Sequence, residues 1–291
     1  MSNRTNGNPQ HLMASLSWHD VTRYRAALLA AHRVGTKRAA LAFVDHVGFC
    51  YAFTGGPGGL PGLFDVLATR SMDRKWEWAW QWKDDLATDK KLFYGKVIRR
   101  KPTYISLRYV PYFYALTGNV GAHDDHLQAY REGRLSLLAK DIYDYLRAHG
   151  TCSTWTLRRQ FVTRGGSGAA FHRALADLQS RLLIGKVAES EGGTYSFIWD
   201  TFDRWFPQSI RSAGRITGSQ AAAQILARYL QTTGASPVSQ IARLFDWPPP
   251  MVANAERALA GTVVRVPIDG RLTLAHVDAI AHRHHRVARR R

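Results

Sequence analysis

The sequence predicts a mainly helical α+β protein with small β-hairpins, built from tandem winged helix-turn-helix units. Two stretches, near residues 134–200 and 218–277, each show three amphipathic helices followed by two short strands. That order of elements is the order of a winged helix. Hydrophobic residues make up 45% of the 291 residues, so the chain can bury a packed core. Its two cysteines are too few for a disulfide framework, which indicates a reducing compartment.

Five segments follow from the patterns along the chain. They are a flexible leader at 1–16, a winged-helix-like domain with a basic, aromatic β-hairpin at 17–133, a second winged-helix domain at 134–205, a third at 206–280 and a basic tail at 281–291. The tail is expected to be mobile. Its histidines lack the carboxylate or cysteine spacing of a metal site, so no metal and no cofactor are predicted.

The N-terminal domain is expected to begin with helices at about 18–33 and 37–47, with another around 60–69. The loop TGGPGG before the third helix is read as a turn. It is not a phosphate-binding loop of the Walker type, because no Gly-Lys-Ser/Thr sequence follows it.

The most unusual stretch is 76–114. Trp76, Trp78, Trp80 and Trp82 alternate along it, which in a strand would place four indoles on one face, more often for packing than for base stacking. The segments KLFYGKVI and TYISLRYV then predict two strands paired around the turn RRKP. Such a basic hairpin could probe a groove of a nucleic acid, or its aromatic residues could build the core and leave only the turn cations in solvent.

The second domain offers a candidate recognition helix at about 168–182. With Phe171 and Leu175 facing inward, its outer face would carry Ala169, Arg173, Ala176 and Ser180. Only Arg173 on that face is a good reader of bases. The surrounding cations suit phosphate binding, and packing of the small face against another winged helix is an equal alternative.

The charge balance indicates the kind of partner. Lys and Arg exceed Asp and Glu by 18, and the sequence pI is about 10.3. Such an excess favours a polyanion, because cations that neutralise phosphates release condensed counterions. DNA bound mainly through its phosphates is the expected partner, against a merely solvated basic surface or an anionic membrane. No apolar stretch reaches the roughly 20 residues of a membrane span, so a cytoplasmic, nucleoid-associated protein is expected. The residues expected to contact DNA are Lys96, Arg99, Arg100, Lys101, Arg158, Arg159, Arg164 and Arg173.

No catalytic constellation stands out. Cys50 is a candidate nucleophile or a buried inert thiol, the second being typical of free cysteine. Asp84 and Asp85 could polarise a water molecule, or be solvated charges. The sequence HDDH at 123–126 suits capping of the helix that follows it better than catalysis.

From about Leu29 to Trp247, the chain resembles proteins related to the AlkZ and YcaQ DNA glycosylases, which repair alkylated and crosslinked DNA. The matching segments are AFVDHVGFCYAF, WQWKDDL, FYGKVIRRKPTYISLRYVPYFYALTGN, GRLSLLAKDIYDYLRAHG, FHRALADLQSRLLIGKV and RLFDW. The resemblance implies tandem winged helices around a DNA-binding channel.

The glycosylases of this family carry a catalytic dyad written Gln-hydrophobic-Gln or Gln-hydrophobic-Asp. The corresponding segment here is Gly48-Phe49-Cys50-Tyr51-Ala52, which has Cys50 and Ala52 at the two polar positions. The leading hypothesis is therefore a DNA-binding relative of repair glycosylases that lacks the usual dyad. An active glycosylase that excises alkylated or crosslinked bases with other residues is one alternative. A winged-helix regulator or protein-interaction scaffold is the other.

Overall fold

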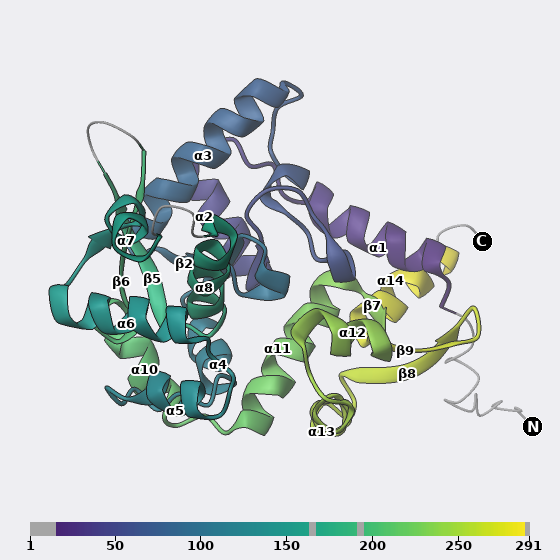
Figure 1. Cartoon of the computed structure of the whole chain (residues 1–291). Helices are drawn as coiled ribbons and strands as arrows, with labels where there is room; N and C mark the ends of the chain where they lie inside the picture. The colour runs from purple at the N-terminus through teal and green to yellow at the C-terminus, as the bar shows by residue number, and fades with distance from the viewer. Residues whose placement is uncertain (1–15, 163–166, 191–194, 289–291) are drawn as a thin grey trace, which may run out of the picture.

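The computed structural model of the chain describes residues 16–162, 167–190 and 195–288, with side chains as far as Arg283. Helices dominate, and the described strands form three small antiparallel sheets (Figure 1). Residues 1–15 of the leader predicted at 1–16 lie outside the described residues, as does Arg164, while Leu16 is buried. The mainly α, partly β class predicted from the sequence is confirmed.

The three sheets share one topology. Their strand orders are β1-β3-β2, β4-β6-β5 and β7-β9-β8, so in each sheet the last strand lies in the middle. In each unit a helix precedes the first strand, and a long helix precedes the hairpin formed by the other two. This is the winged-helix arrangement, repeated three times along the chain. The tandem winged-helix fold is thus confirmed, with the N-terminal region as a complete unit.

The first unit lies in the N-terminal domain predicted at 17–133 and begins with helix α1. Its elements are α1 (Trp18–Ala30), α2 (Lys37–Val47), β1 (Phe49–Tyr51), two short 3-10 turns (Pro57–Gly59 and Leu63–Asp65), α3 (Met72–Thr88), β2 (Leu92–Gly95) and β3 (Thr103–Ser106). The helix expected at 60–69 is wrong, since only the 3-10 turn Leu63–Asp65 forms there. Gly59, Pro61 and Gly62 at its start disfavour a longer helix.

The tryptophan run lies in helix α3, so the strand considered for it is wrong. Ser71 caps the helix by accepting a hydrogen bond from the backbone N–H of Arg74, and no glycine or proline interrupts the next 17 residues. In a helix, residues four apart share a face. Trp78 and Trp82 therefore stack on the inner side, with ring centroids 5.2 Å apart. When every second residue is tryptophan, the alternation alone does not distinguish a strand from a helix.

The predicted hairpin after α3 is confirmed. Strands β2 and β3 pair antiparallel from Leu92 opposite Ser106 to Gly95 opposite Thr103. The turn between them contains a short 3-10 segment, Ile98–Arg100. Two connecting helices follow, α4 (Val110–Ala115) and α5 (Asp125–Arg131).

The second unit matches the elements predicted for it. They are α6 (Leu137–His149), β4 (Cys152–Ser153), α7 (Thr154–Phe161), α8 (Gly168–Ser180), β5 (Ile184–Glu189) and β6 (Phe197–Thr201), followed by α9 (Phe202–Trp205) and α10 (Pro207–Ala213). On α8 the expected inner residues Phe171 and Leu175 are buried, and so is Ala176 of the expected outer face. Gln179 of α8 accepts a hydrogen bond from the backbone N–H of Lys96 in the first hairpin. The C-terminal part of α8 therefore contacts the first winged helix, whereas Ala169 and Arg173 of the expected outer face are exposed.

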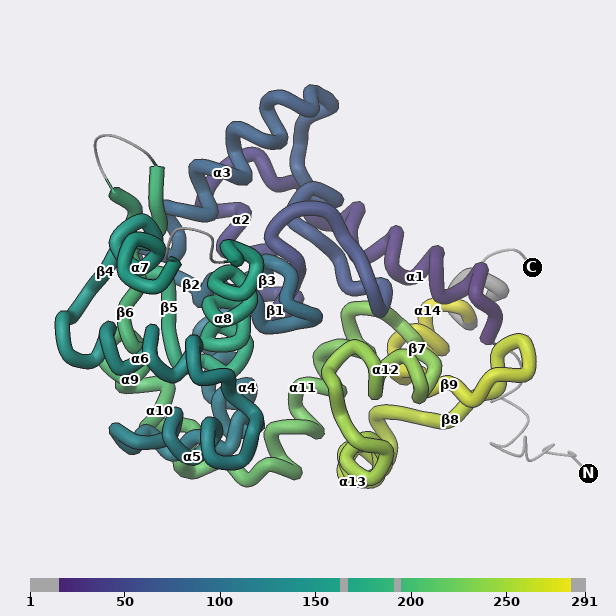
Figure 2. Tube along the Cα trace, in the orientation of Figure 1, coloured from purple at the N-terminus to yellow at the C-terminus, as the bar shows by residue number. Residues whose placement is uncertain are grey.

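The third unit also has the predicted order. Its elements are α11 (Gly218–Thr233), β7 (Ala235–Pro237), α12 (Val238–Phe245), α13 (Pro249–Arg257), β8 (Val263–Ile268), β9 (Arg271–His276) and α14 (Val277–Ala288). Helix α14 extends into the segment expected to be a basic tail at 281–291, so that segment is helical as far as Ala288. Figures 1 and 2 show α11 between the second unit and the other elements of the third unit.

The largest hydrophobic core lies where the three units meet. Phe93, Ile98 and Ile105 of the first hairpin belong to it together with Phe202, next to the second unit, and Ile225 of the third. The two strands of the first hairpin are thus buried between the units, and the turn that joins them reaches solvent.

Candidate nucleic-acid interface

A groove with a volume of about 750 Å³ opens at the junction of the three units. One wall is the turn of the first hairpin, 97–100, and another is the end of α8 at Asp177–Arg181. The connection between α12 and α13, residues 244–248, lines the opposite side. Every winged helix therefore contributes to this groove.

Two consecutive arginines of the hairpin turn enter the groove in a left-handed backbone conformation. Their φ angles are 53° for Arg99 and 54° for Arg100, a region that residues with a Cβ rarely adopt. Arg99 donates a hydrogen bond to the carbonyl oxygen of Arg243 at 3.2 Å. Arg100 forms an ion pair with Asp177 at 2.6 Å while 60% of its side chain stays exposed. Strained conformations of this kind are held by surrounding contacts and concentrate at functional sites.

Two further arginines, Arg134 and Arg181, line the same groove. Burial lowers the pKa of the half-buried Arg181, and repulsion from Arg134 and from Arg100 lowers it further, while Asp177 opposes the shift. Guanidinium groups do not lose their proton near neutral pH, so the lowered pKa reports first the cost of burying this charge and then the repulsion from the neighbouring arginines. An anion in the groove would relieve that repulsion. Phosphate is the anion that guanidinium groups bind best, through paired hydrogen bonds.

The remaining wall of the groove is aromatic. Helix α12 ends at Phe245, and the left-handed conformation of its C-cap residue Asp246 (φ 57°) turns the chain toward α13. The rings of Phe245 and Trp247 on either side of it stack with centroids 4.8 Å apart. A groove with cations along one side and flat apolar rings on the other suits a ligand with both phosphates and rings.

Of the residues predicted to contact DNA that the structure describes, only Arg99 and Arg100 line the groove. Arg158, Arg159 and Arg173 are exposed on α7 and α8. Lys101 is exposed with its ammonium 5.8 Å from the ring of Tyr51. Lys96 is half-buried and bonded through its backbone to α8. The sequence offers no signal for Arg134, because it reaches the groove only through the tertiary arrangement.

The two positions that correspond to the glycosylase dyad lie inside the core of the first unit. Cys50 and Ala52 are both completely buried, in a cluster with Phe43, Leu63 and Tyr104. Burial raises the pKa of the Cys50 thiol far above its ordinary value. A protonated and inaccessible thiol is a poor nucleophile, so this environment fits the inert alternative.

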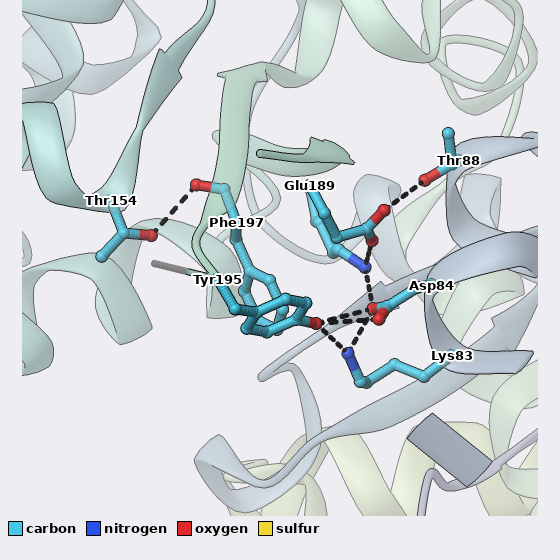
Figure 3. A network of polar contacts seen from close by, with 8 residues as sticks. Lys83, Asp84, Thr88, Thr154, Glu189, Tyr195 and Phe197 are labelled. Carbon is cyan, nitrogen blue, oxygen red and sulfur yellow. Dashed lines mark hydrogen bonds and ion pairs between the residues drawn. The ribbon is translucent and has the colours of Figure 1, made fainter. Parts of the chain in front are cut away.

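Asp84 lies in a polar network between α3 and the hairpin of the second unit (Figure 3). Its carboxylate pairs with the ammonium groups of Lys83 and Lys186, whose side chains are completely buried. The hydroxyl of Tyr195 donates to the same carboxylate at 2.9 Å. Although burial opposes the effect, hydrogen bonds from both lysines lower the pKa of Asp84. A carboxylate held in this way is a weak base and is not the solvated charge that the sequence suggests.

The other acidic candidates have separate surroundings. Asp85 forms an exposed ion pair with Lys37 at 3.0 Å. In the sequence HDDH, Asp125 binds the backbone N–H groups of Val120 and Gly121, so it orders the preceding loop. His126 is buried and bonded to Asp144 at 2.6 Å. Within the described residues, no three His, Cys, Asp or Glu side chains gather in a way that could hold a metal ion.

These features define a protein of three tandem winged helices with an arginine-lined groove where they meet. The family model for AlkZ-related proteins matches residues 34–246. The chain therefore belongs to the AlkZ-related family, as its sequence segments indicate. No curated protein sequence matches the chain significantly.

Among solved structures, the DNA glycosylase AlkZ of Streptomyces sahachiroi is similar to this chain. Its TM-score is 0.59 at 13% sequence identity, and the match covers 92% of this chain and 72% of that chain. At this identity the likeness concerns the fold. In the described part of the chain, no helix has the length and apolar character needed to cross a membrane.

Proposed function

We propose that this protein binds DNA in the groove at the junction of its three winged helices, mainly through phosphates. The observation that carries the proposal is the strained pair Arg99–Arg100, held in the groove beside Arg134 and Arg181. Strain of about 1–3 kcal/mol per residue is retained where function requires the geometry. The net charge of +18 supports the same partner, and so does membership of a family related to a DNA glycosylase.

The proposal includes binding without base excision by the dyad of the related glycosylases. The side chains of Cys50 and Ala52 face the first unit's core, where neither a water molecule nor an extruded base could reach them. Asp84, the best-placed carboxylate outside that segment, is neutralised by two buried lysines. A DNA partner would place the protein on the nucleoid in the cytoplasm.

Duplex binding measured by fluorescence anisotropy at 50 to 200 mM salt tests the first part. An Arg134→Ala, Arg181→Ala double variant should bind more weakly across unrelated sequences, with a slope of log K against log salt reduced by about 2. Arg215→Ala is the matched control, since Arg215 is exposed on the connection before α11. Affinity that depends little on salt would instead favour the protein-interaction scaffold.

Incubation with duplexes that carry alkylated bases or an interstrand crosslink tests the second part. The expected result is binding with no abasic product. Product formed by the wild type but not by Asp84→Asn would show an active glycosylase with a rebuilt site, and the non-catalytic proposal would then be wrong.

A further inference from the structure

Four large aromatic side chains stand in solvent on one side of the first and second units. The exposed fractions are 43% for Trp76, 46% for Trp80, 49% for Tyr195 and 54% for Trp155. We call these four residues the aromatic ridge. Tryptophan is rarely this exposed in a folded protein, and exposed apolar groups that gather together mark interaction sites.

The ridge is continuous across two winged helices. Phe53 lies against both Trp76 and Trp80, with ring centroids 5.4 and 6.1 Å away. Trp80 meets Tyr195 edge to face at 5.9 Å. The backbone N–H of Trp155 donates to the hydroxyl of Ser196, the residue next to Tyr195. The rings of α3 are thus in contact with Tyr195 of the second hairpin, and the backbone of Trp155, at the start of α7, is bonded to the residue that follows Tyr195.

The polar network of Lys83 and Asp84 contacts two residues of the ridge, Trp80 and Tyr195. Tyr195 accepts a hydrogen bond from Lys83 at 2.6 Å and donates to Asp84 (Figure 3). The ammonium of Lys83 also lies 4.3 Å from the ring centroid of Trp80 and 5.3 Å from that of Tyr195. A cation over a ring face attracts the ring electrons toward itself, so the opposite face of Trp80 becomes a better surface for electron-rich rings. The network fixes the rings and leaves their outer side exposed.

We infer that the aromatic ridge stacks the unpaired bases of single-stranded DNA next to a bound duplex. This inference rests on the proposed function, and it concerns the unpaired bases of the DNA, which the groove does not bind. Helix α3 occupies the position of the recognition helix in the first unit, the element that enters DNA in winged helices. Bases within a duplex are already stacked, so exposed rings of this kind suit bases that have lost their partners.

The charges near the ridge suit a nucleic acid. The guanidinium of Arg159 lies 4.6 Å from the ring centroid of Trp155. Arg158, also exposed on α7, contacts His172 of α8, the helix whose far end lines the groove. Cations beside aromatic faces are the usual composition of single-strand binding surfaces. A DNA strand that leaves the groove along α8 would therefore contact Arg158 and Arg159 first and the aromatic ridge after them.

Three labelled DNAs test the inference: a blunt duplex, the same duplex with an unpaired tail, and the single strand alone. Wild type should bind the tailed duplex more tightly than the blunt one. Trp80→Ala and Trp155→Ala should each weaken binding of the tailed duplex and the single strand by about tenfold, with blunt-duplex affinity unchanged. Trp80→Tyr should restore most of the loss, because a phenol ring can still stack. Met72→Ala is the matched control, since Met72 is 53% exposed on the same helix.

Several results would overturn the inference. Equal affinities of wild type for tailed and blunt duplexes would do so, and so would ridge variants that bind every DNA as wild type does. A dimer that dissociates in Trp80→Ala would show that a second copy of the chain covers the ridge. Loss of duplex binding in the groove variants is a separate result: if wild type binds the single strand but not the blunt duplex, the groove proposal fails and the ridge remains.

Discussion

Replacement of Arg99 and Arg100 by glycine should separate two effects: the backbone strain of these residues, which lowers stability, and the contribution of their guanidinium groups to DNA affinity. Both residues have positive φ angles, which cost an ordinary residue roughly 1–2 kcal/mol. Glycine would relieve this strain but lose about 0.5–1 kcal/mol through its more flexible unfolded chain. The ion pair of Arg100 with Asp177 is largely exposed and contributes roughly 0–1 kcal/mol. For each residue these terms nearly cancel, so the free energy of unfolding should stay within about 1 kcal/mol of wild type.

Alanine at the same two positions removes the guanidinium groups but keeps the strain. Each alanine variant should therefore be less stable than the glycine variant by about 0.5–1 kcal/mol, which follows from the strain minus the flexibility of glycine. DNA binding should not distinguish the two substitutions. Both double variants should lose affinity equally, and the slope of log K against log salt should fall by about 2.

Urea denaturation followed by tryptophan fluorescence measures the stabilities, and anisotropy with a labelled duplex measures the affinities. Glycine variants that bind DNA as tightly as wild type would refute the role of the two guanidinium groups. Glycine variants less stable than alanine variants would refute the account of backbone strain. The two parts of the reasoning can thus fail separately.

Three further predictions concern buried groups. Asp84→Ala should lower the free energy of unfolding by about 3–5 kcal/mol in urea denaturation, since it leaves Lys83 and Lys186 buried without their shared counter-charge; a loss below 1 kcal/mol would contradict this. Burial lowers the pKa of Lys83 from 10.5 to about 8, so the unfolded chain binds more protons between these values. The contribution of Lys83 to stability should then rise from pH 8 to pH 10, and Lys83→Met should lack that part of the rise in the urea midpoint. Restoring a dyad with Cys50→Gln and Ala52→Asp should lower the free energy of unfolding by several kcal/mol, because both polar side chains would enter a closed core. The variant should also show no glycosylase activity. Abasic product formed by it would refute the conclusion that these two positions are closed to DNA.

Local patterns in the sequence predicted much of the fold. The helices and hairpins of the second and third units were predictable because apolar spacing, caps such as Ser136 and the Asp269-Gly270 turn lie within a few residues of the elements they shape. Helix α3 was not, since alternating tryptophans fit a strand pattern as well as a helix with two aromatic faces. The helix expected at 60–69 failed because apolar residues there fill the core from an irregular loop.

The candidate site was predictable only in part. Arg99 and Arg100 stood out because basic residues in a predicted turn face solvent, and they do line the groove. Arg134 comes from a distant segment, and its place in the groove depends on how the units pack. Lys186 and Asp84 are 102 positions apart in the chain. A sequence read alone contains no information on such a pair, because each residue by itself resembles a surface charge.

Because the first hairpin lies between the other two units, the length of its turn is constrained by contacts on both sides. In most winged helices the wing ends in solvent, so its turn can lengthen or shorten between relatives at little cost. Here the turn contacts Gln179 of α8 on one side and the carbonyl of Arg243 in α12 on the other. An added residue between Lys96 and Lys101 would change the separation of these two contacts, and we expect it to shift the second unit relative to the third. We therefore expect the length of this one turn to affect the width of the groove, because the turn forms one of its walls.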